Sequence, residues 1–286
     1  MFSSAYQIAR VRGIPIRVHF TLIILLPFLA YNFADAFTSS PLLWGLLAAV
    51  VLFASVALHE FGHSLVAIAK GFPVRDILLL PIGGIAQLVR IPEKPRDEFA
   101  VAIAGPLVSL ALFGGLFALG YGETLLGSRE FADFCLLLGY INLSLCLFNL
   151  LPAFPMDGGR ILRALLTRRK GRLEATRIAA KLGKICALLF GLVGLFGLPG
   201  VVPSNLMLVI IAVFIYISAA SEYRQVLMQE MSHRPPPIFQ WFWSNMRPRR
   251  PAPPPSEPLD NNVTVSPPPW QRRGSTRTDL KPDDEP

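Results

Sequence analysis

Three residues that lie close together in the chain are of the types that bind and use a metal ion. They are His59, Glu60 and His63, in the sequence HEFGH. If this segment is helical, the two histidines share one face, so that both imidazoles can hold the same metal. Glu60 can then act as general base for a water beside that metal. The alternative, packed histidines with an incidental glutamate, is disfavoured because an unpaired ionisable residue in a membrane helix costs about 2.5–3.5 kcal/mol on insertion scales.

A catalytic zinc site usually has three protein ligands, so a third ligand should come from elsewhere in the chain. The candidate is Asp157, in the stretch NLLPAFPMDGGR that begins at Asn149. Its prolines interrupt a helix and its paired glycines permit a tight turn, so the backbone can direct Asp157 inward. The alternative is an ordinary helix exit. The ligand interpretation is favoured because His59 and His63 are expected at the same depth in the membrane as Asp157.

Long uncharged stretches must position these residues. Of the 286 residues, 52% are apolar and only 16% are charged, and the mean hydropathy is +0.48. These values exclude a soluble globular enzyme, a disulfide-stapled secreted domain and a mainly disordered chain. Because a bilayer-spanning helix needs about 20 apolar residues, six spans are predicted, within the uncharged runs 18–34, 42–58, 99–122, 134–156 and 185–221, the last broken at 198–205. We therefore expect an all-α polytopic membrane protein.

The net charge of +8 follows the predicted spans. With the N-terminus in the cytoplasm, every Lys and Arg except Arg129 falls on the cytoplasmic side. The basic character therefore indicates topology and no nucleic-acid partner. It predicts a multi-pass protein of a cell membrane with both termini and the active-site end in the cytoplasm. Separately, we expect this membrane to be the bacterial inner membrane. One alternative is that the first apolar stretch, followed by Ala34-Asp35-Ala36, is a cleavable secretory signal.

The chain divides by composition into a membrane domain, residues 1–231, and a tail, residues 232–286. The tail contains 14 of the 26 prolines and no apolar periodicity. Such a segment cannot bury a core, so we expect it to be largely disordered and cytoplasmic.

The two motifs together resemble those of the site-2 protease family of intramembrane zinc metalloproteases. HExxH in an early span is followed some 90 residues later by NxxPxxPxDGGR, and the resemblance covers roughly residues 10–221. It implies one Zn²⁺ held by His59, His63 and Asp157. It also implies that Glu60 is catalytic and that Asn149 assists near the active site.

Two further segments fit this resemblance. Pro81–Ala86 resembles the family's membrane-re-entrant loop, and Ala104-Gly105-Pro106 resembles its third-span motif, although many members have Asn where this chain has Ser109. Residues 74–90 as a whole are typical of a short β-hairpin with a turn at Gly83-Gly84. Its edge could pair with an extended substrate, or the loop could only seal the site. With no room for a PDZ or paired CBS domain, the chain resembles the compact six-span branch, similar to sporulation-factor processing proteases.

The implied activity is hydrolysis of a peptide bond within or beside a transmembrane segment of a membrane-anchored protein. The partners are then that protein substrate and the lipid bilayer. Two other classes are a membrane metal-ion transporter and a catalytically inactive scaffold. A transporter would usually carry ligands along a path, and a scaffold would be expected to have lost Glu60 or a ligand. Prenyl-protein proteases, which share HExxH, would be expected to use a glutamate as third ligand.

Overall fold

The computed structural model describes residues 5–81, 83–89, 92, 94–126, 129–198 and 203–233. The elements follow in the order β1 (Ala5–Val11), β2 (Ile14–His19), α1 (Phe20–Ala34), α2 (Pro41–Ala69), β3 (Val74–Leu80), β4 (Gly83–Leu88), α3 (Pro95–Leu126), α4 (Arg129–Asn149), α5 (Asp157–Lys170), α6 (Arg172–Phe196) and α7 (Leu206–His233). Apart from the end of α7, the expected proline-rich tail lies outside the described residues.

The helices bear out a multi-pass membrane protein. Among the described residues, α2, α3, α4, α6 and α7 are long and apolar enough to cross a membrane. The first predicted span is the shorter α1, which has 15 residues. At 1.5 Å per residue it extends for about 22 Å, less than the hydrocarbon core of about 30 Å. It is shorter than expected because Val18 and His19 belong to β2.

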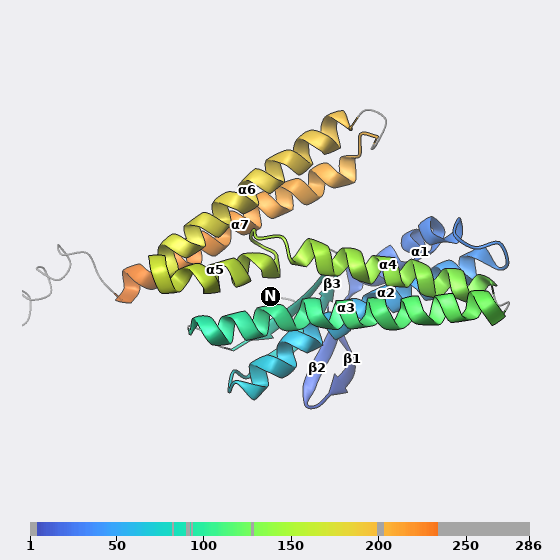
Figure 1. The fold of residues 1–286 in the computed structure, drawn as a ribbon, viewed down its shortest axis with the longest axis horizontal. Coiled ribbons are helices and arrows are strands. Elements are labelled where there is room, and N and C mark those ends of the chain that lie inside the picture. Colours follow the sequence, from blue (N-terminus) through green and yellow to red (C-terminus); the bar gives the residue numbers. More distant parts are fainter. Residues whose placement is uncertain are drawn as a thin grey trace, which may run out of the picture. The chain divides into compact units, whose positions relative to one another are not determined.

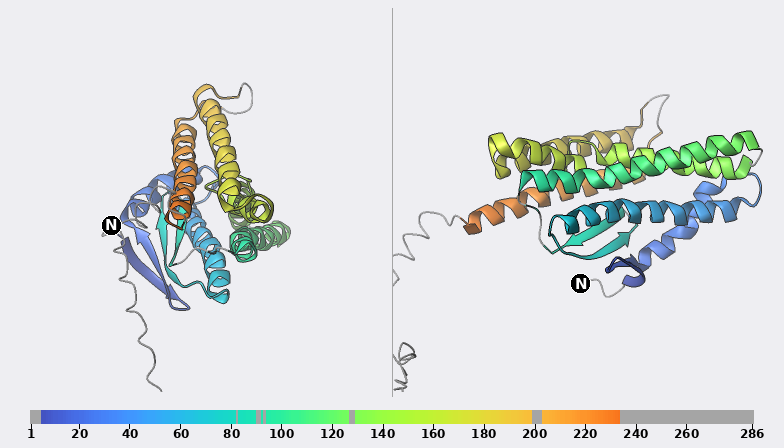
Figure 2. Two further views of the ribbon diagram at one scale, coloured as in Figure 1. Left: turned by 90° about the vertical axis from the view of Figure 1, so that its left-hand side faces the viewer. Right: turned by 60° about the horizontal axis from the view of Figure 1, so that its bottom comes forward.

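The spanning helices pack as pairs. Figures 1 and 2 show α3 beside α4, and α6 beside α7 as a hairpin, in agreement with their contacts. α2 packs against both α1 and α3, while the short α5 packs against α3 and α6. The predicted fourth span ends early, because α4 stops at Asn149 and residues 150–156 form irregular turns around Pro152 and Pro155. This irregular segment leads directly to Asp157.

A four-stranded sheet with the order β1-β2-β3-β4 lies beside α2. β1 and β2 are antiparallel, β2 and β3 are parallel, and β3 and β4 form the predicted hairpin. The predicted turn at Gly83-Gly84 is wrong, because both glycines belong to β4 and pair with Leu80 and Leu79 of β3. The strands β1 and β2 were not predicted from the sequence.

Apolar side chains from the sheet, α1 and α2 hold the hairpin in place. The buried cluster comprises Ile14, Val18, Leu22, Phe53, Val56, Ile77 and Leu79. Val56 lies one turn before the histidine motif on α2, so the same packing sets the position of the sheet relative to that motif. β4, at the end of the sheet, therefore runs close to Glu60.

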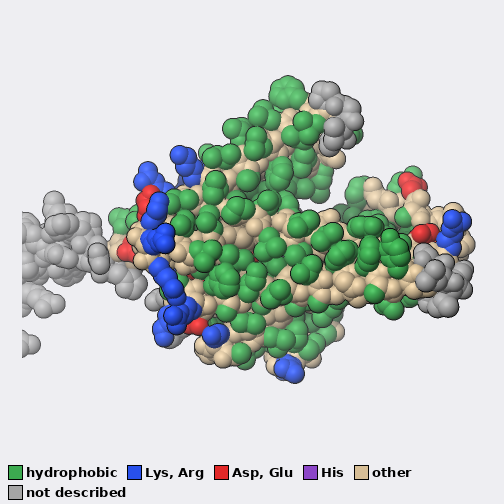
Figure 3. All heavy atoms as spheres, viewed as in Figure 1, with side chains coloured by type: hydrophobic (Ala, Val, Ile, Leu, Met, Phe, Trp, Pro, Cys, Tyr) green, Lys and Arg blue, Asp and Glu red, His purple; other side chains and the backbone are tan. Residues whose placement is uncertain are grey.

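Charged side chains are unevenly distributed over the surface. Figure 3 shows Lys and Arg gathered at the end where α5 meets α6 and where α3 begins, with hydrophobic side chains along the helices. The last turn of α5 alone contributes Arg168, Arg169 and Lys170, all exposed. This distribution matches the charge pattern on which the predicted topology depends.

Candidate metal centre

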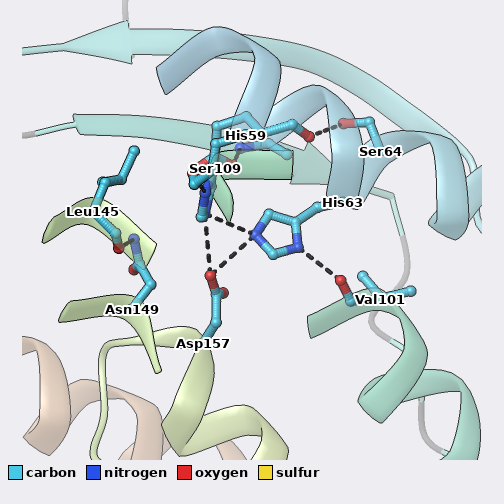
Figure 4. Close-up of polar contacts among 10 residues, drawn as sticks. His59, His63, Ser64, Val101, Ser109, Leu145, Asn149 and Asp157 are labelled. Atoms are coloured by element: carbon cyan, nitrogen blue, oxygen red, sulfur yellow. Dashed lines mark hydrogen bonds and ion pairs between the residues drawn. The ribbon is translucent and has the colours of Figure 1, made fainter. Parts of the chain in front are cut away.

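The three predicted ligands lie together. His59 and His63 project from α2 and Asp157 is the first residue of α5, and all three are buried. The Nε2 atoms of His59 and His63 are 3.2 Å apart. Asp157 Oδ2 lies 3.2 Å from Nε2 of His59 and 3.1 Å from Nε2 of His63. The three atoms thus form a nearly equilateral triangle, visible in Figure 4.

The size of this triangle fits zinc. Tetrahedral zinc with ligand distances of about 2.0–2.1 Å places neighbouring ligand atoms roughly 3.3 Å apart. The measured edges are within about 0.2 Å of that spacing, and imidazole nitrogen and carboxylate oxygen are both normal zinc ligands. The residues therefore fit a zinc ion bound by three side chains.

The outer ring nitrogens of both histidines are held by α3. His63 Nδ1 lies 2.7 Å from the backbone oxygen of Val101, and His59 Nδ1 lies 2.8 Å from Ser109 Oγ. A carbonyl only accepts, so Nδ1 of His63 carries a proton, and in the neutral imidazole Nε2 then presents its lone pair to the triangle. His63 Nε2 lies 3.1 Å from Oδ2 of Asp157. A cation bound between them would interact favourably with both the lone pair and the carboxylate. Outer hydrogen bonds of this kind are usual for metal-binding histidines.

Gly105 of α3 lies directly against the two imidazoles. A Cβ atom at this position would be 2.2 Å from Nε2 of His63 and 2.6 Å from Nε2 of His59. Only glycine leaves room for the rings, which explains the glycine in the Ala104-Gly105-Pro106 segment. No role for Gly105 or Val101 was predicted from the sequence. Their spacing with Ser109, four residues each, nevertheless predicts a common helix face.

Close packing of the DGG segment determines where Asp157 lies. A Cβ on Gly158 would be 2.2 Å from the backbone oxygen of Leu151, and one on Gly159 would be 2.6 Å from the carbonyl carbon of Ala153. The turns after α4 therefore fold back onto the start of α5. Asp157 in the first turn also complements the positive end of the helix dipole.

The turn before Asp157 is also tied to α6. The backbone N–H of Phe154 donates to the backbone oxygen of Ala179 at 3.2 Å. A Cβ on Gly183 would lie 2.1 Å from the backbone oxygen of Phe154, so α6 touches this turn without an intervening side chain. The hairpin of α6 and α7 thus contacts the segment that carries Asp157.

Glu60 lies beside the triangle and is held by β4. Its Oε2 accepts a hydrogen bond from the backbone N–H of Ala86 at 3.0 Å. A Cβ on Gly84 would be 2.5 Å from Cγ of Glu60, so this strand touches the glutamate side chain directly. The hairpin is therefore part of the surroundings of the predicted base.

Asn149 is near the cluster but its amide is turned away. Its Nδ2 donates to the backbone oxygen of Leu145 on the same helix at 3.0 Å. Figure 4 shows it at the end of α4, to one side of Asp157. The structure thus brings together His59, His63 and Asp157, with Glu60 adjacent, and its contacts do not join Asn149 to them.

Within the described part of the chain, His59, His63 and Asp157 form the one group of three potential ligands whose ligand atoms lie within 4.8 Å of one another. A transporter would be expected to place further ligands along a path. The single compact cluster agrees better with a catalytic site.

Comparisons with known proteins point in the same direction. Peptidase family M50 matches residues 47–129 and 114–191 of the chain. A zinc metalloprotease of Methanocaldococcus jannaschii is 40% identical over 227 residues, which make up 77% of this chain and 61% of that protein. Stage IV sporulation protein FB of Bacillus subtilis is 32% identical over 179 residues, 62% of this chain and 59% of that protein. The chain thus spans about three fifths of the length of these two relatives.

A solved structure is similar in fold. The site-2 protease from Methanocaldococcus jannaschii superposes with a TM-score of 0.56 and 37% sequence identity, covering 77% of this chain and 95% of that one. The family matches include the helices that carry all three candidate ligands.

Proposed function

Because this chain belongs to peptidase family M50, the family of site-2 proteases, we propose that it is an intramembrane zinc metalloprotease. It hydrolyses peptide bonds within or beside transmembrane segments of membrane-anchored proteins. The observation that carries this proposal is the triangle of His59 Nε2, His63 Nε2 and Asp157 Oδ2, whose edges of 3.1–3.2 Å suit one zinc ion.

Each residue has a distinct role in the proposed reaction. Zinc bound by His59, His63 and Asp157 would supply a Lewis acid for the scissile carbonyl and for water. Glu60 accepts a proton from the attacking water and returns it to the leaving amine. Asn149 assists near the scissile carbonyl, which requires its amide to turn away from Leu145. Val101 and Ser109 keep the imidazoles oriented throughout.

The free edge of β4 is the proposed site for the substrate backbone. The N–H of Ala86 bonds to Glu60 and so points away from β3. Because direction alternates along a strand, the N–H groups of Gly84 and Leu88 point the same way. A substrate segment that unwinds and pairs with this edge would run past Glu60 and the ligand triangle. Unwinding is necessary because the peptide groups of a membrane helix are bonded internally.

We also propose that the cluster lies toward the cytoplasmic side of a bacterial inner membrane. Asp157 begins α5, and the same short helix ends in Arg168, Arg169 and Lys170. Basic residues concentrate on the cytoplasmic side of membrane proteins. A position near that surface also gives water a short route to the site.

The test is to compare ligand variants with a base variant of the full-length protein. His59→Ala, His63→Ala and Asp157→Asn should lower the zinc content per chain and the cleavage of a membrane-anchored test protein in vesicles. Glu60→Gln keeps the size of the side chain and removes its capacity to accept a proton. It should therefore retain zinc and lose cleavage by about 10²–10⁴-fold. If Glu60→Gln loses zinc while Asp157→Asn keeps zinc and full activity, the assigned roles are wrong.

A further inference from the structure

A buried ion cluster joins three helices close to the metal centre. Arg163 of α5 is 3% exposed and Glu98 of α3 is 5% exposed. Arg163 Nε donates to Glu98 Oε1 at 2.6 Å, and its Nη2 lies 2.5 Å from the same oxygen. Nη1 lies 3.4 Å from Oε2 of Glu222 on α7. Burying these charges costs desolvation free energy, and a buried ion pair often gives little net stability in return. We therefore expect a role for this cluster other than stability.

Arg163 is connected both to the helix that follows Asp157 and to the turn that precedes it. It belongs to the helix that Asp157 begins, and its guanidinium carbon lies 4.8 Å from the ring centre of Phe154, in the turn before Asp157. Phe154 is completely buried and its backbone is bonded to α6. The guanidinium therefore holds the turn and the helix together around the ligand.

The partner of Arg163 stands on the face of α3 that holds the histidines. Glu98 precedes Val101 by three residues, and Gly105 and Ser109 follow at steps of four, so all four share one helix face. Val101 and Ser109 bind the outer nitrogens of the histidines, and Gly105 lies against their rings. Glu98 adds a link from the same face to α5. One stripe of α3 thus sets the positions of both histidines and of the helix that carries the aspartate.

We propose that Arg163 is the positioning residue for Asp157, which it fixes relative to His59 and His63 through Glu98. This inference rests on the zinc-protease function proposed above. Arginine suits the role because its planar fork offers several donors and a flat face at once. It uses them toward Glu98, Glu222 and the ring of Phe154. A lysine would keep the charge but can supply only a point-like ammonium.

The experiment uses full-length protein in detergent and measures zinc content in zinc-buffered solution, the visible spectrum of the Co²⁺-substituted protein, and the melting temperature. Arg163→Lys should stay folded with a lowered melting temperature, bind zinc about tenfold more weakly, and show an altered Co²⁺ spectrum. The matched control is Arg177→Lys, an exposed arginine on α6 paired with Glu174, which should leave all three measurements unchanged.

A second variant separates positioning from charge balance. The double variant Glu98→Gln/Arg163→Met replaces both members of the buried ion pair with uncharged residues. Because neither charge is left buried without its main partner, the melting temperature should be close to wild type while zinc binding stays weak. Wild-type zinc affinity and spectrum in the double variant, or in a folded Arg163→Lys protein, would overturn the inference. Absence of zinc from the wild-type protein in the same assay would instead refute the proposed function itself.

Discussion

The contact between Gly105 and the histidines predicts that Gly105→Ala strongly weakens zinc binding. The added Cβ would lie 2.2 Å from Nε2 of His63, whereas ordinary contacts begin at 3.4 Å. The ring or the α3 backbone must therefore move by about 1.2 Å, the difference between these two distances. Zinc ligand distances tolerate only about 0.2 Å. We expect the zinc affinity to fall at least about 100-fold, or about 2.7 kcal/mol.

Gly115 provides a matched control on the same helix. A Cβ at Gly115 meets no atom within 4 Å, so Gly115→Ala should bind zinc normally. Its helix should be as stable as wild type or more stable, by up to about 1 kcal/mol. The assay is a zinc titration of both purified variants against a chelator of known affinity, with melting temperatures measured on the metal-free proteins. Wild-type zinc affinity in Gly105→Ala would refute the placement of α3 against the imidazoles.

Three other predictions concern the hairpin, the DGG turn and the tail. Ala86→Pro removes the N–H that bonds to Glu60 and should reduce cleavage at least about tenfold with zinc retained. The control Ala86→Ser keeps this N–H and should cleave normally. Equal activity in the two variants would argue against a role for the edge of β4. Gly158→Ala should lower both zinc content and melting temperature, because its Cβ would lie 2.2 Å from a backbone oxygen, while Gly114→Ala, with nothing within 4 Å, should change neither. Truncation after Pro235 should leave a folded protein with zinc and activity, since every candidate ligand precedes that point; a truncated protein without zinc would make the tail part of the fold.

Much of the site follows from local sequence rules. The spacing of His59 and His63 requires one helix face, and the prolines and glycines around Asp157 require a turn at the end of a span. Those rules predicted the cluster that the structure brings together. The zinc-binding roles of His59, His63 and Asp157 stay predictions, as do the catalytic roles of Glu60 and Asn149.

What the sequence did not reveal depends on distant packing. β2 pairs in parallel with β3, far along the chain, at Ile16 with Ile77, and such pairing leaves little trace in a short strand that contains Arg17. Glu98 and Arg163 lie outside the predicted uncharged runs 99–122 and 134–156, and charged side chains outside such runs are usually exposed to solvent. Their burial results from the meeting of α3, α5 and α7.

The hydrogen bond between Ala86 and Glu60 has a consequence for selectivity. If substrates pair with β4, an incoming strand competes with Glu60 for the same N–H. The glutamate loses that donor only when a polypeptide of the right register lies across the site. A segment that stays helical has its carbonyl groups bonded internally, and a small molecule has no strand to pair with β4, so neither would take the Ala86 N–H from Glu60 in this way. Discrimination would then depend on how readily a membrane segment gives up its helix, more than on the identity of its side chains.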